Sequence, residues 1–105
     1  MSTTNWVDAL SADDLPTDDV QGFAVAGRDI AIYTVGDAVY ATDNLCTHGL
    51  ARLCDGFLEG HEIECPLHQG RFDVRSGQPT CAPATEALRS YPVKVEGGRV
   101  WLALD

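Results

Sequence analysis

Two short pairs of cysteine and histidine constrain this chain more than any other feature of its sequence. Cys46 is followed two residues later by His48, and Cys65 is followed three residues later by His68. Thiolate and imidazole groups suit zinc, copper and iron–sulfur centres, whereas Mg²⁺ and Ca²⁺ prefer oxygen ligands. Because each pair supplies one ligand of each kind, we expect all four side chains to bind a single metal centre.

Two kinds of metal centre fit this ligand set. A Cys₂His₂ zinc site usually has its cysteines in one pair and its histidines in another, whereas each segment here carries one of each. In a binuclear iron–sulfur centre of the Rieske type, two histidines replace two cysteines on one of the two irons. The mixed pairs favour the iron–sulfur centre, and a zinc-stabilised binding module is the alternative.

Composition limits the partners of the chain. The 105 residues include 16 Asp and Glu but only 7 Lys and Arg, which gives a net charge of −9. This charge repels phosphates, so we expect no nucleic-acid or membrane partner. The N-terminus lacks the pattern of a signal peptide. We therefore expect a single domain over residues 1–105, a cytoplasmic location, and cysteines that are ligands or buried thiols rather than disulfides.

Short apolar segments separated by turn residues predict an all-β fold. Residues 29–35 and 38–42 flank a Gly-Asp turn, and residues 91–96 and 99–104 flank a Gly-Gly turn, so each pair predicts a hairpin. Both alternating sets of residues 29–35 are apolar, which predicts a strand covered on both faces. In the second hairpin, Val93 and Val95 should share a buried face. These elements predict an antiparallel sandwich or partly open barrel.

Residues 46–78, which contain both pairs, resemble the Rieske ferredoxins of bacterial aromatic-ring dioxygenase systems, especially the naphthalene-dioxygenase type. The resemblance extends over about residues 5–105. It implies an antiparallel Rieske-type β sandwich with a small cluster-binding subdomain and one [2Fe-2S] cluster. It also implies a monomeric electron carrier that takes single electrons from an NAD(P)H-dependent, flavin-containing ferredoxin reductase and passes them to a terminal Rieske oxygenase. A ferredoxin for another Rieske oxygenase, or for a nitrite-reductase-like assembly, is an open alternative.

The resemblance also assigns the ligands. It places Cys46 and Cys65 on the buried iron and His48 and His68 on the outer iron. A Rieske oxygenase needs a further iron held by two histidines and a carboxylate, but His61 is the one histidine left. We therefore expect an electron carrier and not an enzyme.

Four positions differ from the high-potential Rieske proteins of respiratory complexes. Ala51 and Leu67 stand where those proteins have a pair of cysteines joined by a disulfide, and Gly70 and Phe72 stand where they have Ser and Tyr hydroxyls that donate to cluster sulfurs. Such donors stabilise the reduced state. We therefore expect a potential near the low end of the Rieske range of about −150 to +300 mV.

The remaining cysteines and histidine lie outside the two pairs. We expect Cys54 and Cys81 to be free thiols that bind no metal. His61 follows Gly60 in a predicted hairpin turn, so we expect it to be exposed.

Overall fold

The computed structural model describes residues 5–47, 51–67, 69–82, 84 and 86–104. Its strands form three antiparallel sheets. The first sheet has the order β1 (Trp6–Ser11), β11 (Arg99–Ala103), β10 (Val93–Glu96). The second has the order β2 (Val20–Val25), β3 (Arg28–Val35), β4 (Ala38–Asp43), β9 (Ser90–Tyr91). The third has the order β5 (Phe57–Glu59), β6 (Glu62–Glu64), β7 (Arg71–Asp73), β8 (Pro79–Cys81).

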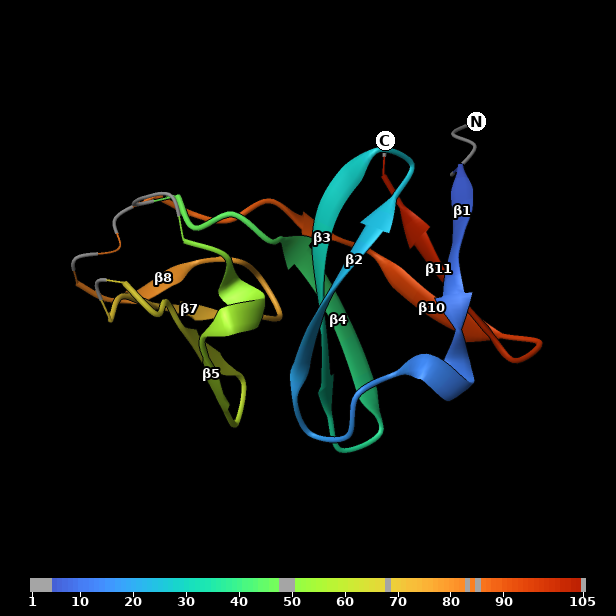
Figure 1. Cartoon of the computed structure of the whole chain (residues 1–105), viewed down its shortest axis with the longest axis horizontal. Helices are drawn as coiled ribbons and strands as arrows, with labels where there is room; N and C mark the ends of the chain where they lie inside the picture. The colour runs from blue at the N-terminus through green and yellow to red at the C-terminus, as the bar shows by residue number, and fades with distance from the viewer. Residues whose placement is uncertain (1–4, 48–50, 68, 83, 85, 105) are drawn as a thin grey trace.

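The first two sheets form a sandwich, and the third sheet belongs to a smaller subdomain beside it (Figure 1). In the view of Figure 1 the subdomain lies to the left, and the chain enters it after β4 and leaves it before β9. The predicted fold class, an antiparallel β sandwich with a small subdomain, is confirmed. The three predicted hairpins are β3–β4, β5–β6 and β10–β11.

Strand β3 separates two hydrophobic cores. Ile30 and Ile32 belong to the sandwich core, while Ala31 and Tyr33 on the other face belong to a second core that we call the loop core. All four side chains are fully buried. Because side chains alternate between the faces of a strand, the doubly apolar pattern of this segment correctly predicted burial on both faces.

The chain passes between sandwich and subdomain through two adjacent strands. The Asp43 N–H, at the end of β4, donates to the Arg89 carbonyl at 2.9 Å. The Tyr91 hydroxyl donates a short hydrogen bond to the Asp43 carboxylate. The guanidinium groups of Arg28 and Arg89 lie 6.0 and 5.2 Å from the centre of the Tyr91 ring. These contacts fix the subdomain at its point of attachment.

Two single 3-10 turns, η1 (Ala12–Asp14) and η2 (Leu53–Asp55), are the helical elements among the described residues. The Ser11 hydroxyl caps η1 by accepting the Asp13 N–H at 3.3 Å. In the part of the chain that the structure describes, no helix is long and apolar enough to cross a membrane. The prediction that Val95 lies on a buried face is wrong. Its side chain is 50 % exposed on β10, an edge strand.

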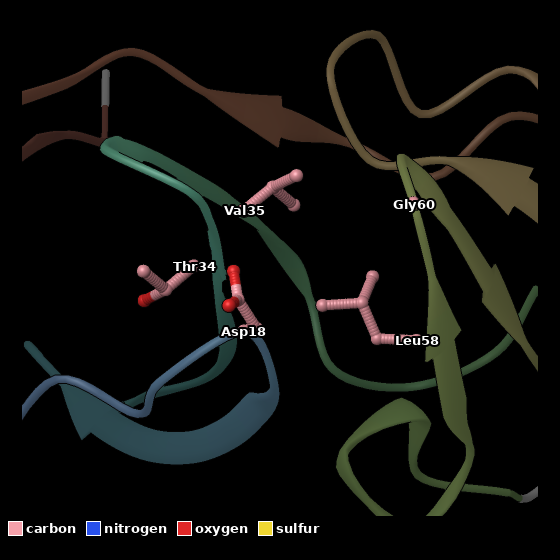
Figure 2. Close-up of a pocket in the computed structure, with 5 residues that line it drawn as sticks. All are labelled: Asp18, Thr34, Val35, Leu58 and Gly60. Atoms are coloured by element: carbon pink, nitrogen blue, oxygen red, sulfur yellow. The ribbon is translucent and has the colours of Figure 1, made fainter.

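A small pocket of about 170 Å³ lies where the subdomain meets the sandwich (Figure 2). Asp18, Thr34 and Val35 line it from the sandwich, and Leu58 and Gly60 line it from the subdomain. Gly60 precedes β6, whereas Cys65 follows β6. The pocket therefore lies at the opposite end of this strand from Cys65.

Candidate metal centre

Cys65 begins a tight loop at the end of a hairpin. Strands β6 and β7 pair up to Glu64 and Arg71, and the Cys65 N–H then donates to the Gly70 carbonyl at 2.8 Å. We call residues 65–70 the second cysteine loop. The Cys65 side chain is 1 % exposed. The regular ladder therefore holds this thiol at the inner end of the loop.

Cys46 begins a loop that closes in the same way. Its N–H donates to the Ala51 carbonyl at 2.9 Å, again between a cysteine and the fifth residue after it. We call residues 46–51 the first cysteine loop. A single antiparallel bridge between Leu45 and Arg52 flanks this loop, and the Cys46 side chain is 5 % exposed. The two loops thus present their cysteines at equivalent positions.

The structure brings both predicted cysteine ligands into one buried region. Cys46 and Cys65 both belong to the loop core, and none of the four cysteines forms a disulfide. Two buried thiols from equivalent loops fit the inner iron of a Rieske centre. His48 and His68 lie outside the described residues. The described residues alone contain no group of three or more Cys, His, Asp or Glu side chains that could bind a metal.

A third segment contacts both cysteine loops. A Cβ atom at Gly70 would lie 2.9 Å from the Ala84 Cβ and 3.1 Å from its backbone nitrogen, so glycine allows this close approach. On the other side, the Thr47 hydroxyl donates to the Glu86 carbonyl at 2.8 Å. The segment that follows β8 therefore connects the second cysteine loop to the first.

An ion-pair network lies at the base of the second cysteine loop. Arg71 contacts Glu64 at 3.0 Å, Glu62 at 3.5 Å and Glu59 at 3.7 Å. Hydrogen bonds to Glu64 and then Glu62 raise the pKa of Arg71. The network is open to solvent, so it adds little stability. It leaves two negative charges in excess on this face of the sheet.

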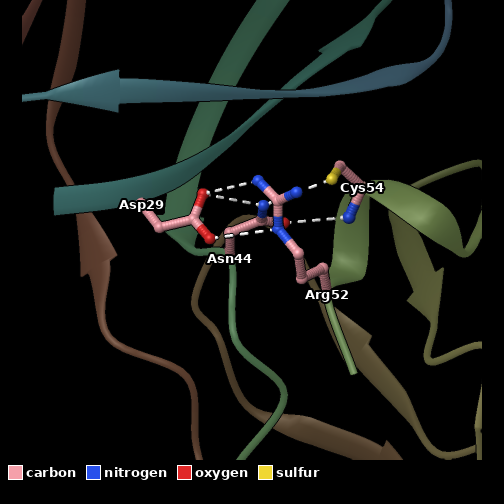
Figure 3. Close-up of polar contacts among 4 residues, drawn as sticks. All are labelled: Asp29, Asn44, Arg52 and Cys54. Atoms are coloured by element: carbon pink, nitrogen blue, oxygen red, sulfur yellow. Dashed lines mark hydrogen bonds and ion pairs between the residues drawn. The ribbon is translucent and has the colours of Figure 1, made fainter. Parts of the chain in front are cut away.

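A second polar network lies at the base of the first cysteine loop (Figure 3). Arg52 donates to both Asp29 carboxylate oxygens at 3.1 Å. The Asn44 side chain, which is fully buried, donates to Asp29 at 3.0 Å and to the Cys54 sulfur at 3.2 Å. Hydrogen bonds from Arg52 and then Asn44 lower the pKa of Asp29. Sequence analysis missed Asn44, because an Asn before a loop is ordinary turn chemistry.

A buried tyrosine hydroxyl also belongs to the loop core. The Tyr33 hydroxyl lies 2.8 Å from the Thr42 hydroxyl. Since Thr42 donates to the Asp43 carbonyl, Tyr33 is the donor between the two hydroxyls. Burial raises the pKa of Tyr33 far above its ordinary value, and the hydrogen bond with Thr42 offsets only part of this rise. This phenol therefore stays protonated.

The other residues singled out in the sequence have mixed outcomes. Cys81 is an exposed thiol and Cys54 a partly buried one, and neither forms a disulfide. The prediction that His61 is exposed is wrong: it is partly buried, and its ring meets Tyr40 edge-on at 5.9 Å between ring centres. Phe72 is fully buried and Leu67 is 58 % exposed.

Comparison with known proteins identifies the family. Residues 5–92 match the family model of the Rieske [2Fe-2S] domain. The chain belongs to this Rieske family. The cofactor is accordingly one [2Fe-2S] cluster, and the zinc alternative is excluded. The Rieske chain is also 58 % identical, over 98 % of its length and 99 % of the relative, to the ferredoxin component of the naphthalene 1,2-dioxygenase/salicylate 5-hydroxylase systems of a Ralstonia species.

Solved Rieske ferredoxins share the whole fold. The ferredoxin of carbazole 1,9a-dioxygenase from Nocardioides aromaticivorans is 40 % identical, with a TM-score of 0.88 over 97 % of this chain and all of that one. A ferredoxin solved in a complex of reduced oxygenase and oxidized ferredoxin of carbazole 1,9a-dioxygenase is 38 % identical, with a TM-score of 0.86 over 96 % of this chain and 94 % of that one. This Rieske protein is thus a ferredoxin, an electron carrier rather than a catalytic component.

Proposed function

We propose that this ferredoxin carries single electrons from an NAD(P)H-dependent, flavin-containing reductase to the terminal oxygenase of a naphthalene-type dioxygenase system. The near full-length identity of 58 % to the ferredoxin component of such systems carries this proposal. When bound, a [2Fe-2S] cluster supplies one-electron redox chemistry. The complex formed by the carbazole ferredoxin and its oxygenase supports the oxygenase as partner.

Four side chains would hold the cluster in this proposal. Cys46 and Cys65 would bind the inner iron, which is supported by their burial in the loop core. His48 and His68 would bind the outer iron. The side chain of Leu67, in the second cysteine loop, is exposed, so this loop reaches the molecular surface. This arrangement would leave the imidazole side accessible to a partner protein.

The residues around the thiols support a low reduction potential. Phe72 is fully buried in the loop core and carries no hydroxyl. Gly70 has no side chain, and Ala84 leaves no room for one. Tyr33, whose phenol is buried in this core, donates its hydrogen bond to the Thr42 hydroxyl. None of these three residues therefore supplies a hydroxyl hydrogen to a sulfur.

Reconstitution with purified partners tests the proposal. The ferredoxin is mixed with NADH, naphthalene, and the reductase and oxygenase of a naphthalene dioxygenase system, and the dihydrodiol product is measured. Product should form only when the ferredoxin is present. The Cys65→Ala ferredoxin should support no product formation. Cys81→Ala, which removes an exposed thiol, is the matched control and should support turnover. Failure of the wild-type ferredoxin to support product formation would contradict the proposal.

We also propose that the ferredoxin works as a monomer in the cytoplasm. Cys54 and Cys81, the two cysteines that are not proposed as ligands, form no disulfide, which supports a reducing compartment. Sedimentation of the holoprotein should give the mass of one 11.3 kDa chain with its cluster. Fractionation of the native host should recover it with the cytoplasmic proteins, and recovery from the periplasm would contradict this location.

A further inference from the structure

The two cysteine loops close with equivalent hydrogen bonds but rest on different supports. The second loop continues a hairpin in which Glu62, Ile63 and Glu64 pair with three residues of β7. The first loop has a single bridge, between Leu45 and Arg52. A hairpin ladder holds both ends of a loop in register, and the ladder beside the first loop is shorter, with backbone hydrogen bonds from Cys46 to Ala51 and from Leu53 to Asn44.

Asn44 lies at the end of this short ladder. Its backbone N–H donates to the Asp29 carbonyl at 3.0 Å, and its carbonyl accepts the Leu53 N–H at 2.7 Å. Its side-chain Nδ2 donates one bond to the Asp29 carboxylate at 3.0 Å and one to the Cys54 sulfur at 3.2 Å. Its Oδ1 accepts the Cys54 N–H at 2.9 Å. One buried residue thus connects β3 to both ends of the first cysteine loop (Figure 3).

The 3-10 turn η2 depends on the same side chain. Arg52, at the N-cap of η2, makes no capping hydrogen bond. The first N–H groups of a helical turn need acceptors from outside it. Asn44, ten residues earlier in the chain, supplies the acceptor for the Cys54 N–H. The carboxamide therefore fixes the segment that follows the loop as well as the one that precedes it.

Strand β2 leaves space for this pair of residues. A Cβ atom at Gly22 would lie 2.9 Å from the Asn44 Nδ2 and 3.1 Å from the Cys54 sulfur. Both atoms are held by hydrogen bonds in a part-buried site, so neither can move aside without losing a bond. The contact between Asn44 and Cys54 therefore requires a glycine at position 22.

We infer that Asn44 is the positioning residue of the first cysteine loop, and that Cys54 is its hydrogen-bond partner rather than a spare thiol. Together the two side chains do for the first loop what the β6–β7 ladder does for the second. The inference rests on the proposed role of Cys46 as an iron ligand, since the loop that Asn44 holds begins at that residue. It gives a structural role to a cysteine that binds no metal.

Variants of Cys54 in the full-length holoprotein test the inference. Alanine removes the acceptor for the Asn44 amide, whereas serine keeps one, so Cys54→Ala should change the cluster environment and Cys54→Ser should restore it. Cys81→Ala is the matched control for loss of a thiol. The measurements are the EPR g values of the dithionite-reduced protein and the rate of iron release to a chelator.

We expect Cys54→Ala to release iron about 2- to 10-fold faster, the range that corresponds to one neutral hydrogen bond, and to shift the g values. Cys54→Ser and Cys81→Ala should match the wild type. Gly22→Ala, which crowds the pair without removing a polar group, should resemble Cys54→Ala. Far-UV circular dichroism should show an intact sandwich in each variant.

Two results would overturn the inference. In the first, Cys54→Ala and Cys81→Ala give the same release rate and the same g values. In the second, Cys54→Ser is impaired as much as Cys54→Ala, which would assign the effect to packing alone. A wild-type spectrum without mixed cysteine and histidine ligation would instead contradict the proposed cluster ligands, so the two failures are distinguishable.

Discussion

The sandwich and the small subdomain differ in the length of their strands and in the residues of their cores. The strands of the β3–β4 hairpin span eight and six residues and bury a core of aliphatic side chains, whereas β5, β6, β7 and β8 span three residues each. The loop core includes the two buried thiols, Cys46 and Cys65. Short strands give little stability on their own. We therefore expect the sandwich to fold by hydrophobic burial, and the subdomain to depend in addition on the metal centre that joins its cysteine loops.

Removal of iron should give the largest contrast between the two regions. Metal binding contributes directly to the folding of small sites that lack a full core. We expect amide hydrogen exchange in β5, β6 and β7 to accelerate by about two orders of magnitude or more after chelation, which corresponds to local opening. Exchange in β3 and β4 should change little. Equal acceleration in both regions would show that the sandwich also depends on the cluster.

A matched pair of leucine substitutions sharpens the comparison. Leu102 lies in the sandwich core and Leu53 in the loop core, and both are fully buried. Each Leu→Ala change should cost about 2–5 kcal/mol of unfolding free energy in the holoprotein. In the iron-free protein, Leu102→Ala should keep its cost and Leu53→Ala should lose most of it. Urea unfolding of the holoprotein and of the iron-free protein measures these costs. If Leu53→Ala lost as much unfolding free energy in the iron-free protein as in the holoprotein, the loop core would not depend on the metal.

Gly70→Ala should act on the subdomain alone. The added Cβ would lie 2.9 Å from the Ala84 Cβ, and such overpacking costs about 1–3 kcal/mol. We expect faster iron release with no change in the unfolding of the iron-free sandwich. Ala51→Gly is the counterpart in the first cysteine loop, where the carbonyl accepts the Cys46 N–H, and it adds no atom. If Ala51→Gly released iron as fast as Gly70→Ala, crowding would not be the cause.

The smallest expected effect is a pH-dependent change in the rate of iron release, caused by protonation of Asp29 on β3. Hydrogen bonds from Arg52 and Asn44 lower the pKa of this carboxyl from its ordinary 3.8. A lowered pKa stabilises the folded state above pH 3.8 and ceases to do so as the pH falls through the folded value. Near neutral pH, Asp29→Asn should release iron slightly faster than the wild type. After a jump to a pH well below 3.8 the two should converge, and a constant ratio at all pH values would contradict this assignment.

The parts of the fold that follow local patterns could be predicted from the sequence. Turn residues located the three hairpins, and the doubly apolar pattern around Ile30 and Tyr33 placed β3 between two cores. Val95 was predicted wrongly because alternation does not reveal that β10 is an edge strand. His61 was predicted wrongly because its contact with Tyr40 joins two hairpins.

In the candidate metal centre, too, some features could be predicted from local sequence patterns and others could not. Spacing alone grouped Cys46 with Cys65, and both are buried in one core. The support for the first loop was not visible in the sequence, because it consists of contacts among Gly22, Asn44 and Cys54 that are ten or more residues apart. Such contacts depend on how β2 and η2 pack, and no local pattern records them.

Pulsed EPR of the dithionite-reduced protein labelled with ¹⁵N-histidine tests the central claim most directly. The claim is that one [2Fe-2S] cluster is held by Cys46, His48, Cys65 and His68. The spectrum should show couplings to two imidazole nitrogens, and His61→Ala should leave both unchanged. A spectrum with no imidazole coupling, or one that loses a coupling in His61→Ala, would contradict the assignment.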